Sequence, residues 1–302
     1  MPVDIAVVGS CNVDLVVNVD SIPTVGQTVL GGDLRRIPGG KGANQAVAAS
    51  RLGKSVAMIG RIGDDENGKF LQTNLEENDV NTEFLFTTPE TPTGVALISV
   101  QNDGDNAIVV SPGANSELSP EDVAAVPLVA EAQVVLLQAE IPIETVLAAA
   151  QVAEGTVMWN PAPAPNESVP LELLDLVDVL VPNQQELELL IGNGSADNLE
   201  SIFAMAKAFP CSSTIVTLGA QGAVVVASNE AVHIPAPEIS PVDTTAAGDS
   251  FCAALAGSLV EGKDLVEAAQ WAVQVGAATT LIAGAQPSLP TSSEVLQRLE
   301  DR

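Results

Sequence analysis

Helical segments alternate with short apolar runs along most of the chain, and this alternation constrains the fold more than any other feature of the sequence. From residue 119 onward, runs rich in Val, Ile and Leu are separated by segments of helical length. Strands that follow one another through helices usually lie parallel, and a parallel sheet is covered by helices on both faces. The sequence therefore predicts an α/β fold of the Rossmann type, with a three-layer α/β/α core.

The pattern places the expected elements by residue range. Strands of the main sheet are expected at 4–9, 55–60, 134–138, 156–159, 177–181 and 214–218, and an antiparallel pair at 223–227 and 231–234. A Gly-rich loop turns into an Ala-rich helix within 39–53, and further helices are expected at 66–77, 143–153, 184–191, 251–260, 265–280 and 292–299.

Two segments, about 15–38 and 91–112, have the mixed apolar and polar pattern of exposed β structure and no helices of their own to cover them. Within the second, residues 93–111 predict a hairpin that turns at Asp103-Gly104. We expect the two segments to form a small β-sheet lid over the end of the main sheet. Both would be inserted in a single domain that spans residues 1–302.

The charge balance excludes several classes of partner. The chain has 39 acidic and 11 basic residues and a net charge of −28. No basic face is available for nucleic acid or for an anionic membrane, so neither is expected to bind. No apolar run reaches the roughly 18 residues of a membrane span, and the N-terminus has no signal-peptide pattern. Three unpatterned cysteines and a single histidine, His233, argue for a reducing, cytoplasmic location and against a multi-histidine metal site.

The stretch 242–251 carries the strongest chemical signal. Small residues, Ala246, Ala247 and Gly248, precede Asp249, which opens an apolar segment of helical length. A helix N-terminus has about four unpaired N–H groups and attracts anions, so the small residues suit an anion cradle. Asp249 beside it suits a general base that takes a proton from an attacking hydroxyl. Taken alone, the motif is more readily interpreted as the start of an ordinary capped helix.

Polar residues also follow several other predicted strands, where ligands bind in open α/β sheets. They are Asn12, Asp14, residues 39–44 with Lys41 and Asn44, Glu140, Asn160, Asn183, Glu186, Thr217 and Gly219. A set rich in carboxylates and amides suits a ligand with many hydroxyls. The glycine run at 39–44 does not match the phosphate loop G-x-x-x-x-G-K-[ST], because its spacing differs and no Ser or Thr follows Lys41.

Taken together, these pieces resemble the ribokinase family of ATP-dependent sugar and nucleoside kinases, nearly from end to end. The matching stretches are Gly-Ser-Cys-Asn-Val-Asp at 9–14, Pro-Gly-Gly-Lys-Gly-Ala-Asn-Gln-Ala at 38–46, Gly-Arg-Ile-Gly-Asp-Asp at 60–65, Leu-Gln-Ala-Glu-Ile-Pro at 137–142, Pro-Asn-Gln-Gln-Glu at 182–186, Thr-Leu-Gly-Ala-Gln-Gly at 217–222, Asp-Thr-Thr-Ala-Ala-Gly-Asp at 243–249 and Gly-Ala-Gln-Pro-Ser at 284–288. Eight motifs in the family's order are far more specific than any one of them.

The resemblance implies a ribokinase-like core and lid, and phosphorylation of D-ribose by ATP at the 5-hydroxyl. It implies that Asp249 is the general base and that the amides of Ala246, Ala247 and Gly248 form the anion hole. It places the sugar against Asn12, Asp14, Gly40, Lys41, Asn44, Glu140 and Asp249. It also implies a homodimer formed through the lid.

The resemblance implies cofactor sites as well. ATP would lie against Asn183, Thr217, Gly219, Gly222, Ala247 and Gly248. Mg²⁺ would be held by Glu186 and Asn183, largely through water. An activating K⁺ would be held by the Asp243 carboxylate, the Ser288 hydroxyl and the carbonyls of Thr245, Thr279, Ile282 and Gly284. Val273 stands where relatives carry Asn or His near the adenine, so this contact would be apolar and the nucleotide preference stays open.

Several alternatives remain at the level of the sequence. The substrate of such a kinase could be another sugar or a nucleoside, such as deoxyribose or a ketohexose. A sugar-binding regulator without activity would be expected to have lost the base or the anion cradle, and both are present. Asp243 could simply cap a turn. Cys11 and Cys252 are interpreted as small buried residues rather than reactive thiols.

Overall fold

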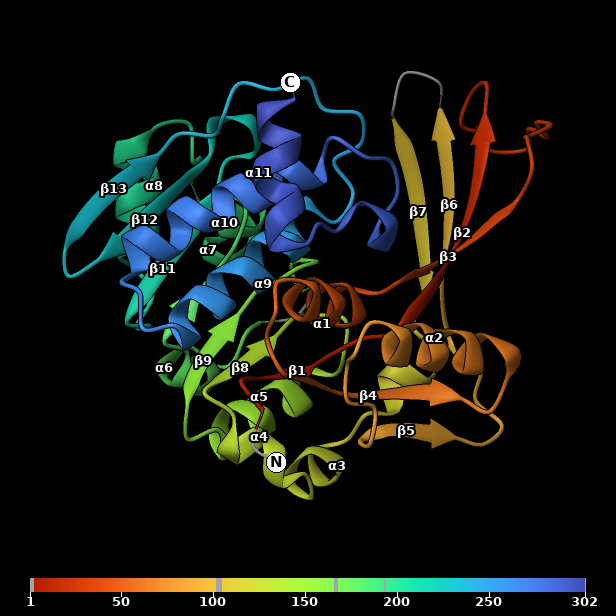
Figure 1. The fold of residues 1–302 in the computed structure, drawn as a ribbon, viewed down its shortest axis with the longest axis horizontal. Helices are drawn as coiled ribbons and strands as arrows, with labels where there is room; N and C mark the ends of the chain where they lie inside the picture. Colours follow the sequence, from red (N-terminus) through yellow and green to blue (C-terminus); the bar gives the residue numbers. More distant parts are fainter. Residues whose placement is uncertain (1–2, 102–104, 166–167, 193, 302) are drawn as a thin grey trace.

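The computed structural model describes residues 3–101, 105–165, 168–192 and 194–301. Its centre is a nine-stranded sheet with the order β13-β12-β11-β10-β9-β8-β1-β4-β5 (Figure 1). The strands are β1 (Ile5–Val8), β4 (Val56–Gly63), β5 (Leu85–Thr88), β8 (Val134–Leu137), β9 (Thr156–Trp159), β10 (Val179–Leu180), β11 (Ser213–Thr217), β12 (Ala223–Ala227) and β13 (Glu230–Ile234). Those from β5 to β11 run parallel, and β12 and β13 are antiparallel. The predicted α/β class and the antiparallel pair are confirmed.

Helices cover both faces of this sheet, which explains why its central strands are apolar throughout. One face is covered by α1 (Lys41–Arg51), α2 (Glu66–Glu77), α9 (Ala247–Val260), α10 (Leu265–Thr279) and α11 (Ser292–Glu300). The other is covered by α3 (Pro120–Ala124), α4 (Pro127–Glu131), α5 (Ile143–Val152), α6 (Leu171–Leu176), α7 (Gln184–Ile191) and α8 (Leu199–Ala206). At β1 both faces of the sheet are therefore covered, and all four residues of this strand are buried.

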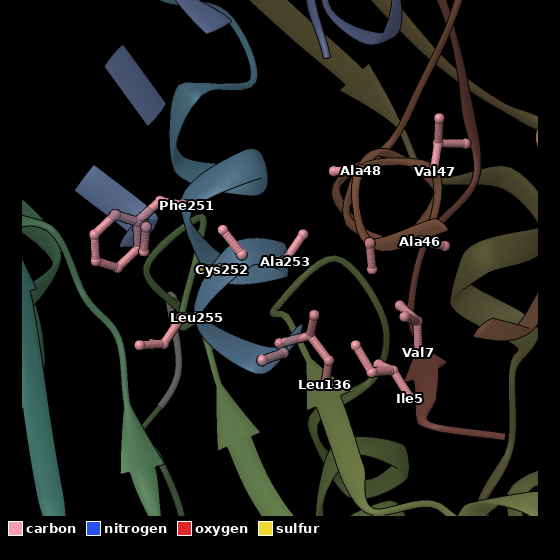
Figure 2. Packing of buried hydrophobic residues seen from close by; sticks show 14 of the residues in the cluster. Ile5, Val7, Ala46, Val47, Ala48, Leu136, Phe251, Cys252, Ala253 and Leu255 are labelled. Atoms are coloured by element: carbon pink, nitrogen blue, oxygen red, sulfur yellow. The ribbon is translucent and has the colours of Figure 1, made fainter. Parts of the chain in front are cut away.

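Small side chains let α1 and α9 approach each other closely above the sheet. Figure 2 shows Ala46 on α1 and Ala253 on α9 facing one another, with Leu136 of β8 and Ile5 of β1 beneath them. Burial of such apolar side chains stabilises the fold by roughly 25 cal/mol per Å². The packing also fixes the N-terminal ends of α1 and α9, which carry most of the predicted site.

A second, four-stranded sheet projects from one end of the core and forms the lid (Figure 1). Its order is β3-β2-β6-β7, with β2 at Asn12–Val19, β3 at Arg35–Gly39, β6 at Gly94–Gln101 and β7 at Asn106–Ser111. The two segments predicted to pair therefore do so, through the parallel pair β2–β6. The turn predicted at Asp103-Gly104 lies outside the described residues. The single-domain organisation stays a prediction.

The structure differs from the sequence-based expectations at several boundaries. The lid begins at Asn12 rather than near residue 15, so Asn12 and Asp14 belong to a lid strand and not to the end of β1. Residues 20–34 form no strand apart from one bridge, Val19 to Gly31. Helix α9 begins at Ala247, before the expected residue 251, because its first turn is built from small residues. Strand β5 and the helices α3, α4, α6 and α8 were not predicted.

None of the helices in the described ranges is both long and apolar enough to cross a membrane.

Candidate active site

The carboxyl ends of the central strands and the N-termini of α1 and α9 meet at one place, and Asp249 lies at its centre. Asp249 is in the first turn of α9 and is 7% exposed. The residue before the helix, Ala246, has left-handed backbone angles (φ 60°, ψ 9°). An alanine tolerates this conformation poorly, and here it directs the chain so that the helix start faces the site.

Two adjacent amide side chains of α1 hold the carboxylate of Asp249. Asn44 Nδ2 donates to Asp249 Oδ2 at 2.9 Å, and Gln45 Nε2 donates to Asp249 Oδ1 at 3.1 Å. Both amides are buried, at 6% and 0% exposure. The other polar atom of Asn44, Oδ1, is buried without a partner among the described residues. An orphaned acceptor of this kind indicates a ligand hydroxyl.

Glu140 follows β8 and joins the first loop of the chain to the start of α1. Its Oε2 accepts from Ser10 Oγ at 2.5 Å and from the backbone N–H of Lys41 at 3.0 Å. The Ser10 hydroxyl in turn accepts from the N–H of Gly42 at 3.3 Å. Glu140 is thus placed with Lys41 as predicted, in a position fixed by three chain segments.

Asp14 points from β2 across the start of α1. A side chain at Gly39 would put its Cβ 2.3 Å from Asp14 Oδ2, and one at Gly40 would lie 2.6 Å from the backbone nitrogen of Asn12. Gly40 also has a φ of +89°. The two glycines therefore admit the lid strand to the site. Burial raises the pKa of Asp14 to about 7, and the charges of Glu140 and Asp249 add to this shift.

Lys41 is the positive charge within this acidic cluster. Burial lowers the pKa of Lys41, but Asp249, Glu140 and Glu186 outweigh burial, so the net pKa is raised and the ammonium stays charged. These interactions also show that Glu186 belongs to the same cluster as the predicted sugar residues.

Asn183 and Glu186 cap the start of α7 reciprocally. The N–H of Glu186 donates to Asn183 Oδ1, and the N–H of Asn183 donates to Glu186 Oε2, both at 2.8 Å. Burial raises the pKa of Glu186. The cap uses one carboxylate oxygen of Glu186 and leaves a rigid, partly buried carboxylate, which fits a site for a hydrated divalent ion. In the described ranges, His, Cys, Asp and Glu side chains form no cluster of three or more able to hold a metal directly.

The predicted anion cradle has room for a ligand. A Cβ added at Gly248 would meet no atom within 4 Å, although α9 and α1 are otherwise closely packed. Gly248 and Asp249 lie in the first helical turn, where N–H groups have no partner within the helix. The N–H of Ala247 instead donates to the carbonyl of Thr244 at 3.3 Å. The open donors of the cradle are therefore centred on Gly248 and Asp249 rather than on Ala247.

A hollow of about 260 Å³ lies between β13 and α10, and Val273 is part of its wall. Thr217 ends β11, and Gly219 and Gly222, with φ of +56° and +93°, form the turn that follows. A Cβ at Gly222 would lie 1.9 Å from the carbonyl oxygen of Ile234, another wall residue. Of the residues predicted to border the nucleotide, Gly222 therefore lies beside this hollow.

The residues predicted to hold K⁺ come together in part. Asp243 Oδ1 accepts from the Thr245 N–H at 2.9 Å and its hydroxyl at 2.6 Å, and Oδ2 accepts from the Gly284 N–H at 2.8 Å. The hydrogen bond from the Thr245 N–H to Asp243 Oδ1 is the turn cap that the sequence left open as an alternative role for Asp243. Burial alone would raise the pKa of Asp243. Hydrogen bonds from Thr245 and Gly284 outweigh burial, so the net pKa is lowered. Thr279 and Ser288 are fully buried, and the Ser288 hydroxyl donates to the carbonyl of Ala285. Ile282 lies in the same loop and is partly exposed.

Four polar residues of the site were not assigned a role from the sequence. Ser10 and Gln45 lie inside quoted motifs, so their position was a usable signal. Gln138 follows β8 in the same way. Asn115 holds both backbone groups of Cys11 and donates to Asn12 Oδ1 at 2.8 Å, and no pattern around it indicates this.

The two cysteines near the site are inert. Burial raises the pKa of Cys11 to about 12, and burial with the Asp249 charge raises the pKa of Cys252 well above its usual value. A thiol that stays protonated is a poor nucleophile. The interpretation of both as small core residues fits the structure.

Comparison with known proteins agrees with this geometry. The profile of a family described as pfkB family carbohydrate kinase matches residues 3–292. The chain is 39% identical to the ribokinase of Bacillus subtilis over 300 residues, 98% of this chain and 99% of the relative. It is 37% identical to a deoxyribokinase of Salmonella typhi over 295 residues, 95% and 96% of the two chains. The structure of Arabidopsis thaliana ribokinase complexed with ribose and ATP superimposes with a TM-score of 0.90 at 31% identity and covers 99% of both chains.

Proposed function

The chain belongs to the pfkB family of carbohydrate kinases, and from this we propose that it acts as a ribokinase, transferring the γ-phosphoryl group of ATP to the 5-hydroxyl of D-ribose. The observation that carries the proposal is the surplus of buried acceptors beside Asp249. Asn44 Oδ1 is buried and has no partner in the described part of the chain, and Asp14 is half-buried close to the charge of Glu140. Each hydroxyl of ribose supplies a donor for these acceptors, and desolvated acceptors without donors are costly.

The proposed reaction uses Asp249 as the base. As the oxygen of the 5-hydroxyl forms its bond to the γ-phosphorus, the bond between that phosphorus and the bridging oxygen of ADP breaks, and the hydroxyl proton passes to the Asp249 carboxylate. Asn44 and Gln45 each occupy one lone pair of the two oxygens, and each oxygen has a second lone pair for the proton. The N–H groups of Gly248 and Asp249 stabilise charge on the transferred group.

Two ions fit the residues present. Mg²⁺ would be held at Glu186 and Asn183 and would neutralise charge on the ATP phosphates. K⁺ would be held by Asp243 and the carbonyls of the neighbouring loops, and would keep the loop that precedes the anion cradle in place. In that setting Ala246 keeps its left-handed conformation, and the cradle amides stay directed at the phosphate.

A kinase for 2-deoxyribose is the second candidate, because a deoxyribokinase is almost as similar in sequence. Ribose offers one donor more to the same acceptors, so we expect the larger kcat/KM with ribose. A site built to bind a hydroxyl rejects the analogue that lacks it by a large factor, about 10⁴ in the strongest cases. A coupled ADP-release assay over pentoses, hexoses and nucleosides tests the proposal. Equal or higher kcat/KM with deoxyribose or a nucleoside would overturn it, as would sugar binding without ADP release.

Replacing Gly248 with alanine should impair turnover without harming the fold. The added Cβ meets no atom of the protein, and alanine is favoured over glycine in a helix by up to about 1 kcal/mol, so the melting temperature should be unchanged or higher. The same methyl group occupies the space above the cradle amides, so the KM for ATP should rise and kcat should fall. Kinetics and calorimetry on the same preparation check both halves. Wild-type kcat in Gly248→Ala would contradict the cradle.

Activity should depend on K⁺ through Asp243. We expect K⁺ to raise kcat in a buffer free of Na⁺ and K⁺, with little change in the KM for ribose, because the ion would act on the loop and not on the sugar. Choline chloride at equal ionic strength is the control, since a chain of charge −28 responds to salt in general. An equal response to choline, or a K⁺ response retained in Asp243→Ala, would contradict the site.

The lid is expected to pair with the lid of a second copy. Its edge strand β7 is exposed along its length, and Leu97, Ile108, Val109 and Val110 are 46–65% exposed. An unprotected apolar edge strand favours association. The negative charge opposes it, so the dimer should tighten as salt is added.

Sedimentation velocity at low and high KCl measures this association. Leu97 and Val109 are cross-strand partners, so Val109→Lys should weaken the dimer, whereas Leu296→Lys, at an exposed position on α11, should not. A monomer at every salt concentration would contradict the prediction.

A further inference from the structure

The geometry points to Gln45 as the positioning residue of the base: a buried amide that locks the Asp249 carboxylate to the carboxyl ends of three strands. This inference rests on the proposed role of Asp249 as the base. Gln45 lies within the quoted 38–46 motif, next to a residue proposed to bind sugar, but it is itself fully buried. We therefore expect Gln45 to contact other protein groups and not the sugar.

Every hydrogen-bonding group of the Gln45 side chain is used. Its Nε2 donates to Asp249 Oδ1 at 3.1 Å and to Asn160 Oδ1 at 3.2 Å, and its Oε1 accepts from Gln138 Nε2 at 2.7 Å. A primary amide has two N–H donors, so both are committed. The side chain can neither rotate nor exchange its oxygen and nitrogen without losing these bonds.

The partners of Gln45 are held in turn by the sheet. Asn160 follows β9, and its Nδ2 donates to the carbonyl of Val181, after β10, at 2.8 Å. Because this bond fixes the amide orientation of Asn160, its oxygen must face Gln45. Gln138 follows β8, and its other contact is with the carbonyl of Leu136. The carboxylate is thereby tied to β8, β9 and β10 at once.

The first strand makes room for this network. A Cβ added at Gly9 would lie 2.0 Å from Gln138 Oε1. The glycine after β1 thus leaves space for the Gln138 amide, whose Oε1 has no hydrogen-bond partner among the described residues. The end of β1 is therefore a fourth segment of the chain beside this network.

The network matters because a base must present its lone pair in one direction. Asn44 contacts the carboxylate through Nδ2, and no described residue holds its Oδ1, so its amide is fixed on one side only. The Gln45 amide is fixed on both sides. A misplacement of about 1 Å at a reacting group lowers the rate by up to roughly 100-fold. Loss of the Gln45 amide should therefore reduce kcat and leave the binding of both substrates nearly unchanged.

The test is Gln45→Met, which keeps the length of the side chain and removes its hydrogen bonds. We expect kcat to fall by roughly 10- to 100-fold, with the KM values for ribose and ATP within about threefold. Val47→Ala is the matched control, because Val47 is fully buried on the same helix and packs only in the apolar core. Should Gln45→Met fail to fold, Gln138→Met removes the donor to Gln45 Oε1 and should show the same effect on kcat, to a smaller degree.

The decisive step is the double variant. If Gln45 acts through Asp249, adding Gln45→Met to Asp249→Asn should lower the residual rate by less than about threefold, because coupled residues are non-additive. A full additional loss would overturn the inference, as would an unchanged kcat in Gln45→Met, or an equal loss in Val47→Ala at the same melting temperature. The sugar that best supports ADP release in the wild type is used throughout. Failure with ribose alone therefore counts against the proposed function and not against this role.

Discussion

Asp249→Asn should lower kcat by about 10²- to 10⁴-fold, the usual contribution of a general base, with ribose and ATP affinities within a few-fold of wild type. The variant places an amide nitrogen opposite one of two donors, Asn44 Nδ2 or Gln45 Nε2. Gln45 is fixed, but Asn44 can turn its amide over, because its Oδ1 has no partner within the described residues. The fold should therefore tolerate the change.

Calorimetric titration with ribose and with a non-hydrolysable ATP analogue, together with steady-state kinetics, separates binding from turnover in Asp249→Asn. Retention of more than about a tenth of the wild-type kcat would show that Asp249 is not the base. A melting temperature far below wild type would instead assign the loss to folding, and a circular dichroism melt of each preparation makes that distinction.

Asp14→Asn should stabilise the unliganded protein at high pH while it weakens ribose binding. The pKa of Asp14 is about 7 in the folded chain, against 3.8 for an unperturbed aspartate. Below the lower value the carboxyl is protonated in both states and costs nothing. Between the two values the unfolded chain releases its proton while the folded chain keeps it, so stability falls as the pH rises, and above about 7 no more is lost.

At about 1.4 kcal/mol per pKa unit, the stability gained by Asp14→Asn should be larger at pH 8 than at pH 5 by up to about 3 kcal/mol. Urea unfolding at the two pH values measures the difference, and ribose titration measures the affinity. Asp33→Asn, which removes an exposed carboxylate between β2 and β3, controls for the change in net charge. An equal gain in stability at both pH values, or no gain, would contradict the account of Asp14 as a carboxylate whose ionisation destabilises the unliganded fold.

The sequence predicted elements well where pattern and capping residue agree. Helices α2 and α7 have the predicted bounds, and each begins at a side chain that caps it, Asp65 and Asn183. Boundaries failed where small residues carry no pattern. The start of α9 at Ala247 and the passage from β1 to β2 at residues 9–11 are both of this kind.

The site was predicted by residue type but not by contact. Asp249, Asn44, Glu140 and Asp14 could be collected because each follows a motif or a strand end. Gln45 could not be given a role, because its partners Gln138 and Asn160 are far from it in the chain and meet it only through the register of the sheet. Contacts of this kind depend on tertiary packing, which local sequence does not encode.

The central claim, transfer of phosphate to the 5-hydroxyl of ribose, is tested most directly by the ³¹P spectrum of the product. The reaction of the enzyme with ATP, Mg²⁺, K⁺ and D-ribose is followed by proton-coupled ³¹P NMR. The account predicts growth of ADP signals and of one phosphomonoester whose phosphorus is split into a triplet by the two hydrogens on C5. A doublet, which indicates an ester at a secondary or anomeric carbon, or inorganic phosphate as the sole new signal besides ADP, would contradict it.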